Sequence, residues 1–420
     1  MSLSLAILVA PSLGQILTSP DLRGAAVGAF VATTDGRGLW AKNADARLMP
    51  ASNQKLFSVA YALDVLGPAY RSETRFWRDE DSIGIDSDGT LDVSYAKLKA
   101  FAENLGRRPR AVLWQAYRPG RPGSWQIGDA VNRYAPTIAA FSCERAGVEV
   151  RANREGGLEF VPAAFGITVR DVREAIGAEA RRIAKGLRYD PTLGEIYRAR
   201  GAKIAPGAVD TLSQPFPDLS AAELFGEETE DGPDPSLIRR RAPDATLLTD
   251  PIGVVAGRCL KPSDNYLAEH LLMMAATREV GSAADWESGP KAFADWSRRR
   301  VSLPEGTFDP ADGSGLSRKN LVTSRAVVRL LNWARTQGWG ATYLDALAKP
   351  GEGTLKGRLA GVGFRGKTGT LTGVSSLSGL VRTKSGRELA VSLIMNHYPC
   401  SAARARQIQD EWVRRVAATF

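Results

Sequence analysis

The pattern of apolar and polar residues near both ends of the chain predicts strands separated by short turns. Strand candidates cover 25–33, 38–42, 367–370, 375–382 and 388–395, most of them rich in apolar residues. Turn residues such as Asp35-Gly36 and Lys384-Ser385-Gly386 connect successive runs. Five strands linked in this way predict one antiparallel sheet to which the two ends of the chain both contribute.

Apolar residues at helical spacing lie beside these strands. One helix is expected to bury a single stripe and to end before Gly67-Pro68, with apolar positions at Leu56, Val59, Ala60, Leu63 and Leu66. The run 402–418 has the same period and predicts a helix packed over the sheet. Residues 247–274 also read as largely helical, and another helix is expected from about Thr323.

The middle of the chain differs in composition from the two ends. Residues 75–245 are rich in Arg, Gly and Pro, and they predict helices at 95–105 and 169–186, short strands at 148–152 and 158–162, and an acidic loop at 227–234. Because the flanking strands belong to one sheet, this segment is expected to be an inserted domain. The predicted organisation is a catalytic domain in two parts, 1–74 and 246–420, interrupted by the insertion at 75–245.

Composition excludes several classes of function. The chain has 420 residues, with 55 Lys+Arg against 46 Asp+Glu, giving a net charge of +9 that is spread along the sequence. This mild excess is compatible with peripheral association with a cell wall or an anionic membrane surface, and it does not imply nucleic-acid binding. Three scattered cysteines and two histidines predict neither a disulfide framework nor a histidine-based triad or metal site.

The first residues carry a weak export signal. Leu3 to Ala10 form a short apolar run that resembles the core of a secretory signal, although no Lys or Arg precedes it. No stretch approaches the roughly 20 apolar residues needed to span a bilayer.

Candidate chemistry begins with Ser-x-x-Lys, because residues three apart on a helix share a face and a lysine can then activate a serine. The pattern occurs at Ser52 with Lys55, at Ser94 with Lys97, and at Ser288 with Lys291. At least two of these must be coincidental if the chain has a single site. The first is favoured because two further motifs follow it in order.

These motifs are Ser263-Asp264-Asn265 and Lys367-Thr368-Gly369. Taken separately, each motif is explained about equally well by a structural role as by a catalytic one. Ser52 and Lys55 could be a helix cap and a solvated lysine, Ser263-Asp264-Asn265 a helix N-cap, and Lys367-Thr368-Gly369 an edge-strand turn. Together and in this order they form the set used by penicillin-binding proteins and class A β-lactamases.

The flanking residues resemble one family more closely. Pro50 to Leu56, Ser263 to Glu269, Asp312 to Arg318, Gly353 to Leu355 and Lys367 to Leu371 are similar to the class C, low-molecular-mass penicillin-binding proteins of the D-alanyl-D-alanine carboxypeptidase/endopeptidase family, peptidase family S13. The resemblance implies an α+β, serine β-lactamase/DD-peptidase-like fold: a five-stranded antiparallel sheet flanked by helices, a helical subdomain and a large inserted domain. The insertion departs from the family in lacking a Gly-Asp-Pro-Thr-Leu segment after its first strands.

The resemblance also implies roles for particular residues. Ser52 would be the nucleophile and Lys55 its base, kept neutral by burial and by the nearby cation of Lys367. Ser263 would bridge the two lysines and relay a proton toward the departing amine, and Asn265 would orient the substrate amide by hydrogen bonds.

The remaining implied residues bind the substrate. Lys367 and Thr368 of the Lys-Thr-Gly motif, which ends at Gly369, would hold the terminal carboxylate. The backbone N–H groups of Ser52 and Thr370 would form the oxyanion hole.

The predicted function is that of a periplasmic or otherwise extracytoplasmic serine DD-peptidase. It would hydrolyse the D-Ala-D-Ala bond of peptidoglycan stem peptides, and D-configured cross-links as well, through an acyl-enzyme on Ser52 and without a cofactor or metal. β-Lactam antibiotics would act as inhibitors. A β-lactamase or related esterase is the enzymatic alternative, although the Glu-x-x-Leu-Asn segment of class A enzymes is absent. An inactive peptidoglycan-binding protein is the alternative from another class.

Overall fold

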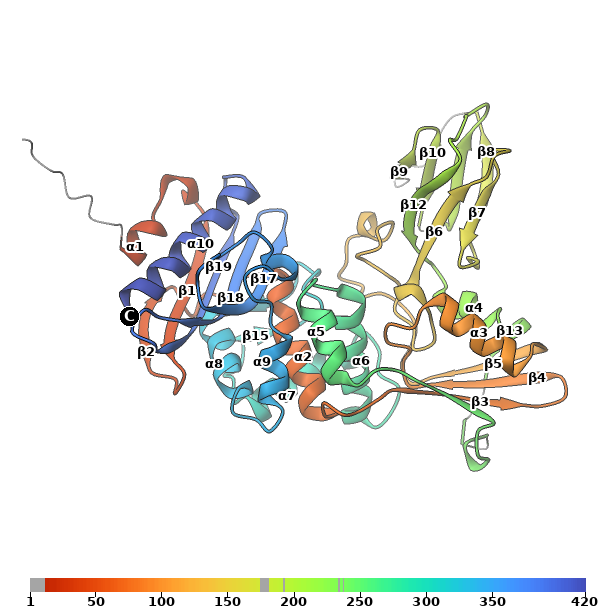
Figure 1. Ribbon diagram of the computed structural model, residues 1–420, viewed down its shortest axis with the longest axis horizontal. Helices are drawn as coiled ribbons and strands as arrows, with labels where there is room; N and C mark the ends of the chain where they lie inside the picture. The colour runs from red at the N-terminus through yellow and green to blue at the C-terminus, as the bar shows by residue number, and fades with distance from the viewer. Residues whose placement is uncertain (1–11, 174–180, 192, 233–234, 237) are drawn as a thin grey trace, which may run out of the picture.

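The computed structural model describes residues 12–173, 181–191, 193–232, 235–236 and 238–420. The apolar run at Leu3 to Ala10, which resembles a secretory signal, lies outside the described residues. The molecule is elongated, with one large sheet and its helices at one end and two sheet-bearing arms at the other (Figure 1). No helix among the described residues combines the length and the hydropathy needed to cross a membrane.

The large sheet is the predicted five-stranded antiparallel sheet, which is confirmed. Its strands follow the order β17, β18, β19, β1, β2, with bounds Phe364–Leu371, Val374–Arg382, Glu388–Asn396, Ala26–Thr33 and Gly38–Lys42. Each neighbouring pair is antiparallel. The strands from the two ends of the chain meet where β1 pairs with β19.

Helices cover both faces of this sheet because its central strands are apolar on both sides. The core on one face includes α1 (Leu13–Ile16) and α10 (Ala402–Thr419). On the other face α8 (Ser324–Ala334) packs through Val328 against Phe30 and Leu380. The predicted terminal helix therefore lies over the sheet as expected.

A helical layer adjoins the sheet and surrounds α2. It consists of α2 (Gln54–Val65), α5 (Ile252–Leu260), α6 (Asn265–Val280), α7 (Ser288–Arg300) and α9 (Gly340–Ala346), with the small ribbon of β15 (Phe308–Asp309) and β16 (Leu321–Val322). The expectation that α2 buries one stripe is wrong, since all its residues from Gln54 to Leu63 are buried. Contacts with α5, α6, α7, α8 and α9 enclose the helix on every side.

The first arm of the middle segment is a mixed sheet. Its strands follow the order β13, β5, β4, β3, β14, with bounds Gly226–Asp231, Arg108–Gln115, Ser82–Ser87, Glu73–Arg78 and Ala245–Leu248. Its core includes residues of the predicted helix α3 (Tyr95–Leu105) and of α4 (Pro217–Ala222). Most of the expected acidic loop at 227–234 is instead strand β13, which pairs in parallel with β5 and so satisfies its backbone.

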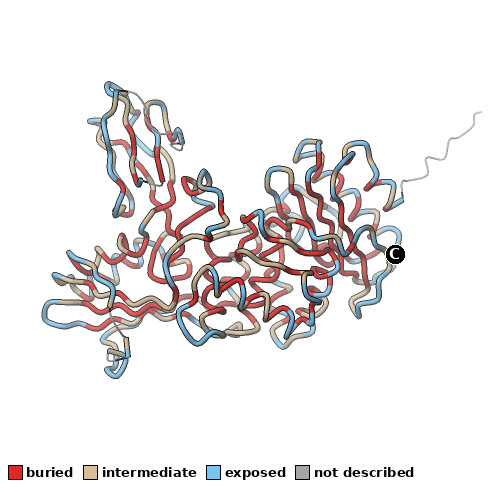
Figure 2. Tube along the Cα trace, turned by 180° about the vertical axis from the view of Figure 1, so that it is seen from behind, coloured by how far each residue is buried: buried red, intermediate tan, exposed pale blue. Residues whose placement is uncertain are grey.

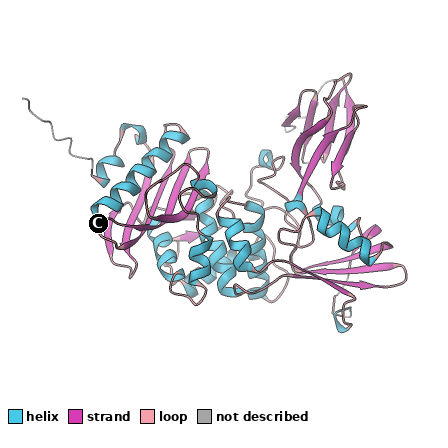
Figure 3. Cartoon of the chain, viewed as in Figure 1, coloured by secondary structure: helices cyan, strands magenta, loops and turns pink. Residues whose placement is uncertain are grey.

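The second arm contains two smaller sheets (Figure 3). One has β12 (Gly207–Ser213), β6 (Gly147–Ala152) and β7 (Leu158–Val161), and the other has β8 (Thr168–Val172), β11 (Glu195–Ala199), β10 (Leu187–Asp190) and β9 (Arg181–Ala184). The helix expected at 169–186 is wrong where the chain is described, because β8 and β9 lie there. Ile183 joins Leu187, Tyr189 and Ile196 in a buried sheet face, and this packing outweighs the helical propensity of the local sequence.

The middle segment also shares a core with the helical layer. Leu91, Tyr117, Ile138 and Ala146 belong to the same buried cluster as α2 and α6. Figure 2 shows this buried chain continuing between the two halves of the molecule. The expected divisions at 74/75 and 245/246 fall within β3 and β14, which bring the two ends of the middle segment together in one sheet.

Candidate active site

The segment that carries Ser52 is a single 3-10 turn, Ala51–Asn53, at the start of α2. Ala51 has a φ of +46°, a strained conformation for a residue other than glycine, directly before the serine. Ser52 is partly exposed whereas Asn53, Gln54 and Lys55 are buried. The Lys55 Nζ lies 3.1 Å from the Ser52 Oγ.

The other two Ser-x-x-Lys sequences have structural explanations. Ser94 caps α3, and its hydroxyl accepts a hydrogen bond from the Lys97 backbone N–H. Ser288 is the first residue of α7, and its hydroxyl donates to Asp285. In the part of the chain that the structure describes, neither serine forms a hydrogen bond with the side chain of its lysine.

The surroundings of Lys55 match a neutral amine. Its Nζ lies 2.6 Å from Asn265 Oδ1 and 2.6 Å from the Ser314 carbonyl oxygen, in addition to the 3.1 Å contact with Ser52. A neutral amine has two hydrogens for the two oxygens and one lone pair, which can accept the Ser52 hydroxyl proton. The position is therefore arranged for a general base.

A buried loop, residues 312–317, provides the Ser314 carbonyl. The Glu269 carboxylate accepts hydrogen bonds from the backbone N–H groups of Gly313 and Ser314 at 2.7 and 2.8 Å. Gly315 has a φ of +84°, and a Cβ there would lie 1.9 Å from the Ala51 carbonyl oxygen. Only glycine lets the loop approach the nucleophile segment this closely.

Asp312 holds the same loop from inside. Its carboxylate accepts from the backbone N–H groups of Gly315 and Ser317, from Asn320 Nδ2 and from the indole Nε1 of Trp125 at 2.8 Å. The last of these donors belongs to the middle segment, which therefore takes part in supporting the site.

The second motif precedes and begins α6. Asp264 is the N-cap and accepts from the Leu267 backbone N–H. Asn265 lies between the halves of the molecule, with its Oδ1 on Lys55 and its Nδ2 donating to the Tyr134 carbonyl oxygen at 2.6 Å. The expected bridge from Ser263 to the two lysines is not formed, since its side chain makes no hydrogen bond within the described chain. Ser263 has a φ of +69°, another strained position in the site.

The third motif lies on β17, the edge strand of the large sheet. Asn53 Nδ2 donates to the Lys367 carbonyl oxygen at 3.0 Å, which ties the strand to the nucleophile segment. A Cβ at Gly369 would lie 2.9 Å from the Ser52 backbone nitrogen, so glycine is needed for this approach. Thr370, the next residue, is exposed.

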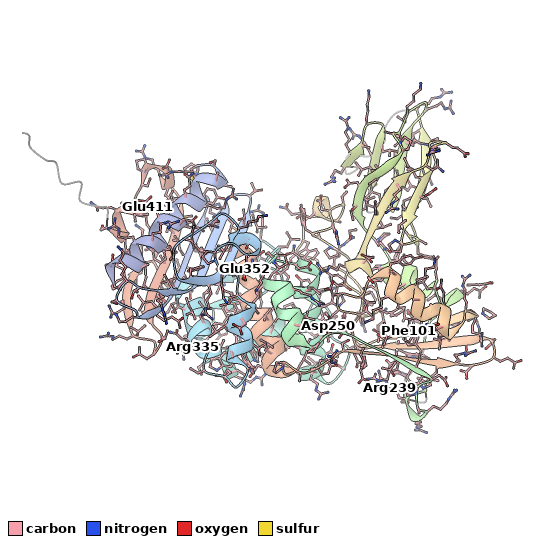
Figure 4. The ribbon with its side chains drawn as sticks, in the orientation of Figure 1. Phe101, Arg239, Asp250, Arg335, Glu352 and Glu411 are labelled. Atoms are coloured by element: carbon pink, nitrogen blue, oxygen red, sulfur yellow. The ribbon has the colours of Figure 1, made fainter. Side chains whose placement is uncertain are left out.

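A short link joins the second and third motifs. Thr368 Oγ1 donates to Thr354 Oγ1 at 2.7 Å, and the Thr354 backbone N–H donates to the Lys261 carbonyl oxygen. Lys261 also pairs with Glu352, the residue labelled in Figure 4. The segment 352–355 thus connects β17 to the turn that precedes Ser263.

The two lysines of the site are buried without an ion pair in the described chain. Burial lowers the pKa of Lys55. The Cys259 thiol and the carboxylates of Asp312 and Glu269 act in the opposite direction, but the effect of burial is larger. Burial also lowers the pKa of Lys367 well below its ordinary value, and the charge of Lys55 lowers it further. Because this repulsion is mutual, the pair resists carrying two protons.

A left-handed turn from the middle segment clamps the second motif. Glu144, Arg145 and Ala146 all have φ between +50° and +55°. Arg145 donates to Asp264 Oδ2 and to Asp92 Oδ1, both at 2.8 Å. Three consecutive non-glycine residues in this conformation are costly, which points to a functional reason for holding Arg145 there.

The sequence located the three motifs, and the structure brings Ser52, Lys55 and Asn265 into direct contact while β17 approaches Ser52. Sequence reasoning missed Ser314, Glu269, Tyr134 and Arg145. The first two belong to motifs that carried the family resemblance, so a signal was present for them. Nothing in the local sequence marked Tyr134 or Arg145, which reach the site only through the packing of the middle segment.

Comparison with known proteins agrees with this geometry. Residues 9–181 and 245–419 match the model of the D-Ala-D-Ala carboxypeptidase 3 (S13) family. A D-alanyl-D-alanine carboxypeptidase from an Actinomadura species is 30% identical, covering 96% of this chain and 83% of the relative. A carboxypeptidase DacB from Mycolicibacterium smegmatis is 25% identical, covering 93% of this chain and 80% of the relative.

A solved structure has the same fold. Penicillin binding protein 4 from Haemophilus influenzae superposes with a TM-score of 0.77 at 20% identity, covering 97% of this chain and 100% of that one. The family match spans both parts of the chain that carry the three motifs. The chain therefore belongs to the D-Ala-D-Ala carboxypeptidase 3 (S13) family and is a serine D-Ala-D-Ala peptidase.

Proposed function

We propose that Ser52 attacks the carbonyl carbon of the peptide bond between two D-alanine residues of a peptidoglycan stem peptide, and that Lys55 accepts its proton. The observation that carries this assignment is the set of three contacts around the Lys55 Nζ, which suits a neutral amine. The partial exposure of Ser52 beside a buried base leaves its hydroxyl accessible to a substrate.

The proposed reaction proceeds in two stages. A bond forms between Ser52 Oγ and the carbonyl carbon, the C–N bond breaks, and the leaving amine takes the proton from Lys55. Ser263 is proposed as the relay for this proton, a role for which its hydroxyl is free of other hydrogen bonds in the described chain. Water then attacks the ester, and Ser52 regains its proton.

The remaining residues of the set are proposed to bind the substrate. Asn265 orients the substrate amide, for which its contact with the Tyr134 carbonyl must be exchanged. Lys367 and Thr368, followed by Gly369, receive the terminal carboxylate. The backbone N–H groups of Ser52 and Thr370 stabilise the oxyanion.

The two buried lysines suggest how binding activates the base. A substrate carboxylate beside Lys367 favours the charged form of that lysine, because an opposite charge compensates its burial. Repulsion from the charged Lys367 then favours the neutral form of Lys55. In this proposal, substrate binding favours the charged form of Lys367 and the neutral form of Lys55, so that Lys55 can accept the proton from the Ser52 hydroxyl.

The cellular setting is also a proposal. The enzyme is expected to act outside the cytoplasm on cell-wall stem peptides, as a carboxypeptidase and on D-configured cross-links. The net charge of +9 supports peripheral contact with the anionic wall or membrane surface. Residues 1–74 and 246–420 would carry the chemistry, and 75–245 would act as the inserted unit that supports and extends the site.

Penicillin tests the assignment of Ser52, because its strained amide resembles the D-Ala-D-Ala end. A Haemophilus influenzae relative has been solved in complex with a β-lactam. Incubation of this protein with penicillin should add one long-lived acyl group, detected by intact mass and located by peptide mapping on Ser52. The adduct should be absent from Ser52→Ala and present on Ser94→Ala, the control with the same local motif.

Two outcomes would contradict the proposal. An adduct that persists in Ser52→Ala would place the nucleophile elsewhere. Rapid release of hydrolysed penicillin, without hydrolysis of D-Ala-D-Ala peptides, would identify a β-lactamase instead.

A further inference from the structure

Glu269 is a fully buried carboxylate on α6 that the proposed reaction does not use. It follows Asn265 by four residues, so the two side chains share one face of the helix. Both of its oxygens are acceptors: Oε2 accepts from the Gly313 backbone N–H at 2.7 Å, and Oε1 accepts from the Ser314 backbone N–H at 2.8 Å. The carboxylate therefore grips two successive peptide groups of the 312–317 loop.

No arginine or lysine among the described residues forms an ion pair with Glu269. In contrast, Glu279 at the far end of the same helix pairs with Arg299 and accepts from the Tyr61 hydroxyl. A buried carboxylate without a counter-ion is costly. The position of Glu269 therefore has a reason other than the stability of an ion pair.

The loop that Glu269 holds is the loop that faces the base. Ser314 donates its N–H to Glu269 and presents its carbonyl oxygen to the Lys55 Nζ at 2.6 Å. Asn265 contacts the same Nζ through its Oδ1, also at 2.6 Å. One face of α6 therefore fixes both oxygens that accept from the Lys55 amine, one directly and the other through Glu269.

Glu269 also acts on the base through its charge. As a carboxylate it favours the charged form of Lys55 and so raises the pKa of that lysine, although burial lowers this pKa more strongly. Burial, and next the charge of Asp312, raise the pKa of Glu269 itself to about 8, while hydrogen bonds from Ser314 and the Gly313 backbone lower it. The carboxylate therefore ionises near the pH range in which a general base is most effective.

The ionisable groups that face Lys55 act in opposite directions. A charged Lys367 on β17 favours the neutral form of Lys55, because the repulsion between the two amines is mutual. The groups that favour the charged form of Lys55, when they are themselves ionised, come from α5, from α6 with its N-cap, and from the 312–317 loop: Cys259, Asp312, Glu269 and Asp264. Removal of Glu269 and removal of Lys367 should therefore shift the base in opposite directions.

We propose that Glu269 is a positioning residue for the general base. It holds the Ser314 carbonyl against Lys55 and, as a carboxylate, stabilises the ammonium that forms when Lys55 takes the proton from the Ser52 hydroxyl. The inference rests on the proposed DD-peptidase function and gives α6 a second role in it, beyond that of Asn265. Glu269 itself exchanges no bond with the substrate, from which its burial separates it.

The pH profile of acylation by penicillin tests this role. Glu269→Gln removes the charge and leaves one of the two loop N–H groups without its acceptor, so the plateau rate should fall about 30-fold. The acidic limb of the profile should move to lower pH by about one unit, because the Lys55 ammonium loses a nearby opposite charge. This direction is opposite to the one expected on loss of Lys367.

Two further variants separate charge from position. Glu269→Asp keeps the charge but is one methylene shorter, so it should keep the parent limb and lose part of the plateau rate. Glu279→Gln is the control, because it removes a carboxylate of the same helix that lies outside the site, and it should match the parent in both limb and plateau.

The outcomes separate this inference from the proposed function. A parent that penicillin does not acylate would contradict the DD-peptidase assignment. A Glu269→Gln protein that is acylated more slowly but keeps the parent limb would overturn the role of the charge, since a merely structural role lowers the rate at every pH. A Glu269→Asp protein with the parent plateau would overturn the positioning role, and this result is sufficient even if Glu269→Gln does not fold.

Discussion

The two halves of the molecule bury charge in opposite ways. In the first arm of the middle segment, Asp86 is fully buried and is paired by Arg239 through two hydrogen bonds of 2.8 Å and by Arg75 at 3.3 Å. Arg239 is labelled in Figure 4 below β3. In the catalytic half, Lys55 and Lys367 are equally buried and form no ion pair within the described chain.

The difference indicates what each buried charge is for. A carboxylate paired by two arginines fixes the relative positions of its partners, so Asp86 is a structural residue. An uncompensated amine loses its proton readily, and that is the property a general base requires.

Lys55→Ala should have the largest effect. Loss of the proposed general base is expected to slow acylation by penicillin by about 10³-fold. The variant should fold with a lower unfolding temperature, because the substitution leaves a cavity and removes the donor from Asn265 Oδ1 and the Ser314 carbonyl. Stopped-flow or quench measurement of acylation, together with thermal unfolding, checks both expectations. A variant that acylates at the parent rate would remove Lys55 from the mechanism.

Asp86→Asn should act on stability rather than on catalysis. Leaving Arg239 and Arg75 without their shared carboxylate is expected to lower the free energy of unfolding by about 3 kcal/mol, measured by urea denaturation. Asp81→Asn removes an exposed partner of Arg110 and should leave the free energy of unfolding close to that of the parent, because solvent screens this pair. If the two variants lost the same free energy of unfolding, the distinction between the buried Asp86 pairs and the exposed Asp81 pair would be contradicted.

Lys367→Ala should reduce acylation about 100-fold by removing the cation proposed to bind the substrate carboxylate. It should also shift the pH profile. Without the repulsion from Lys367, the pKa of Lys55 rises, so a higher pH is needed to produce its neutral form and the acidic limb of the profile moves upward. Lys367→Arg should keep part of the affinity while misplacing the wider guanidinium. An unchanged limb in Lys367→Ala would show that Lys367 does not influence the base.

Arg145→Ala should have the smallest effect of the series, about a tenfold loss in acylation rate, because Arg145 acts only by holding Asp264 and the turn before Asn265. Arg145→Lys should recover part of the rate. Arg151→Ala, which breaks an exposed pair with Glu149, serves as the control and should acylate as the parent does. A parent-like rate in Arg145→Ala would indicate that the left-handed turn has no part in positioning the motif.

The sequence by itself determined the features that depend on local patterns. Alternating apolar residues and short turns predicted the strands of the large sheet, since hairpin pairing depends on neighbours in the chain. The order of the three motifs with their flanks predicted the family and the place of Ser52 and Lys55. Local patterns failed at 169–186, where the described residues form β8 and β9 because they pair with neighbouring strands and Ile183 packs into a buried sheet face.

Only the tertiary structure decided what surrounds the base. The Ser314 carbonyl lies 259 positions from Lys55 along the chain, and Tyr134 lies 131 positions from Asn265. Contacts at such separations leave no periodic signal, because they depend on how the middle segment packs on α2 and α6. The same is true of burial, since the sequence shows only that Lys55 and Lys367 are ionisable, whereas the packed structure shows that both are buried without an ion pair in the described chain.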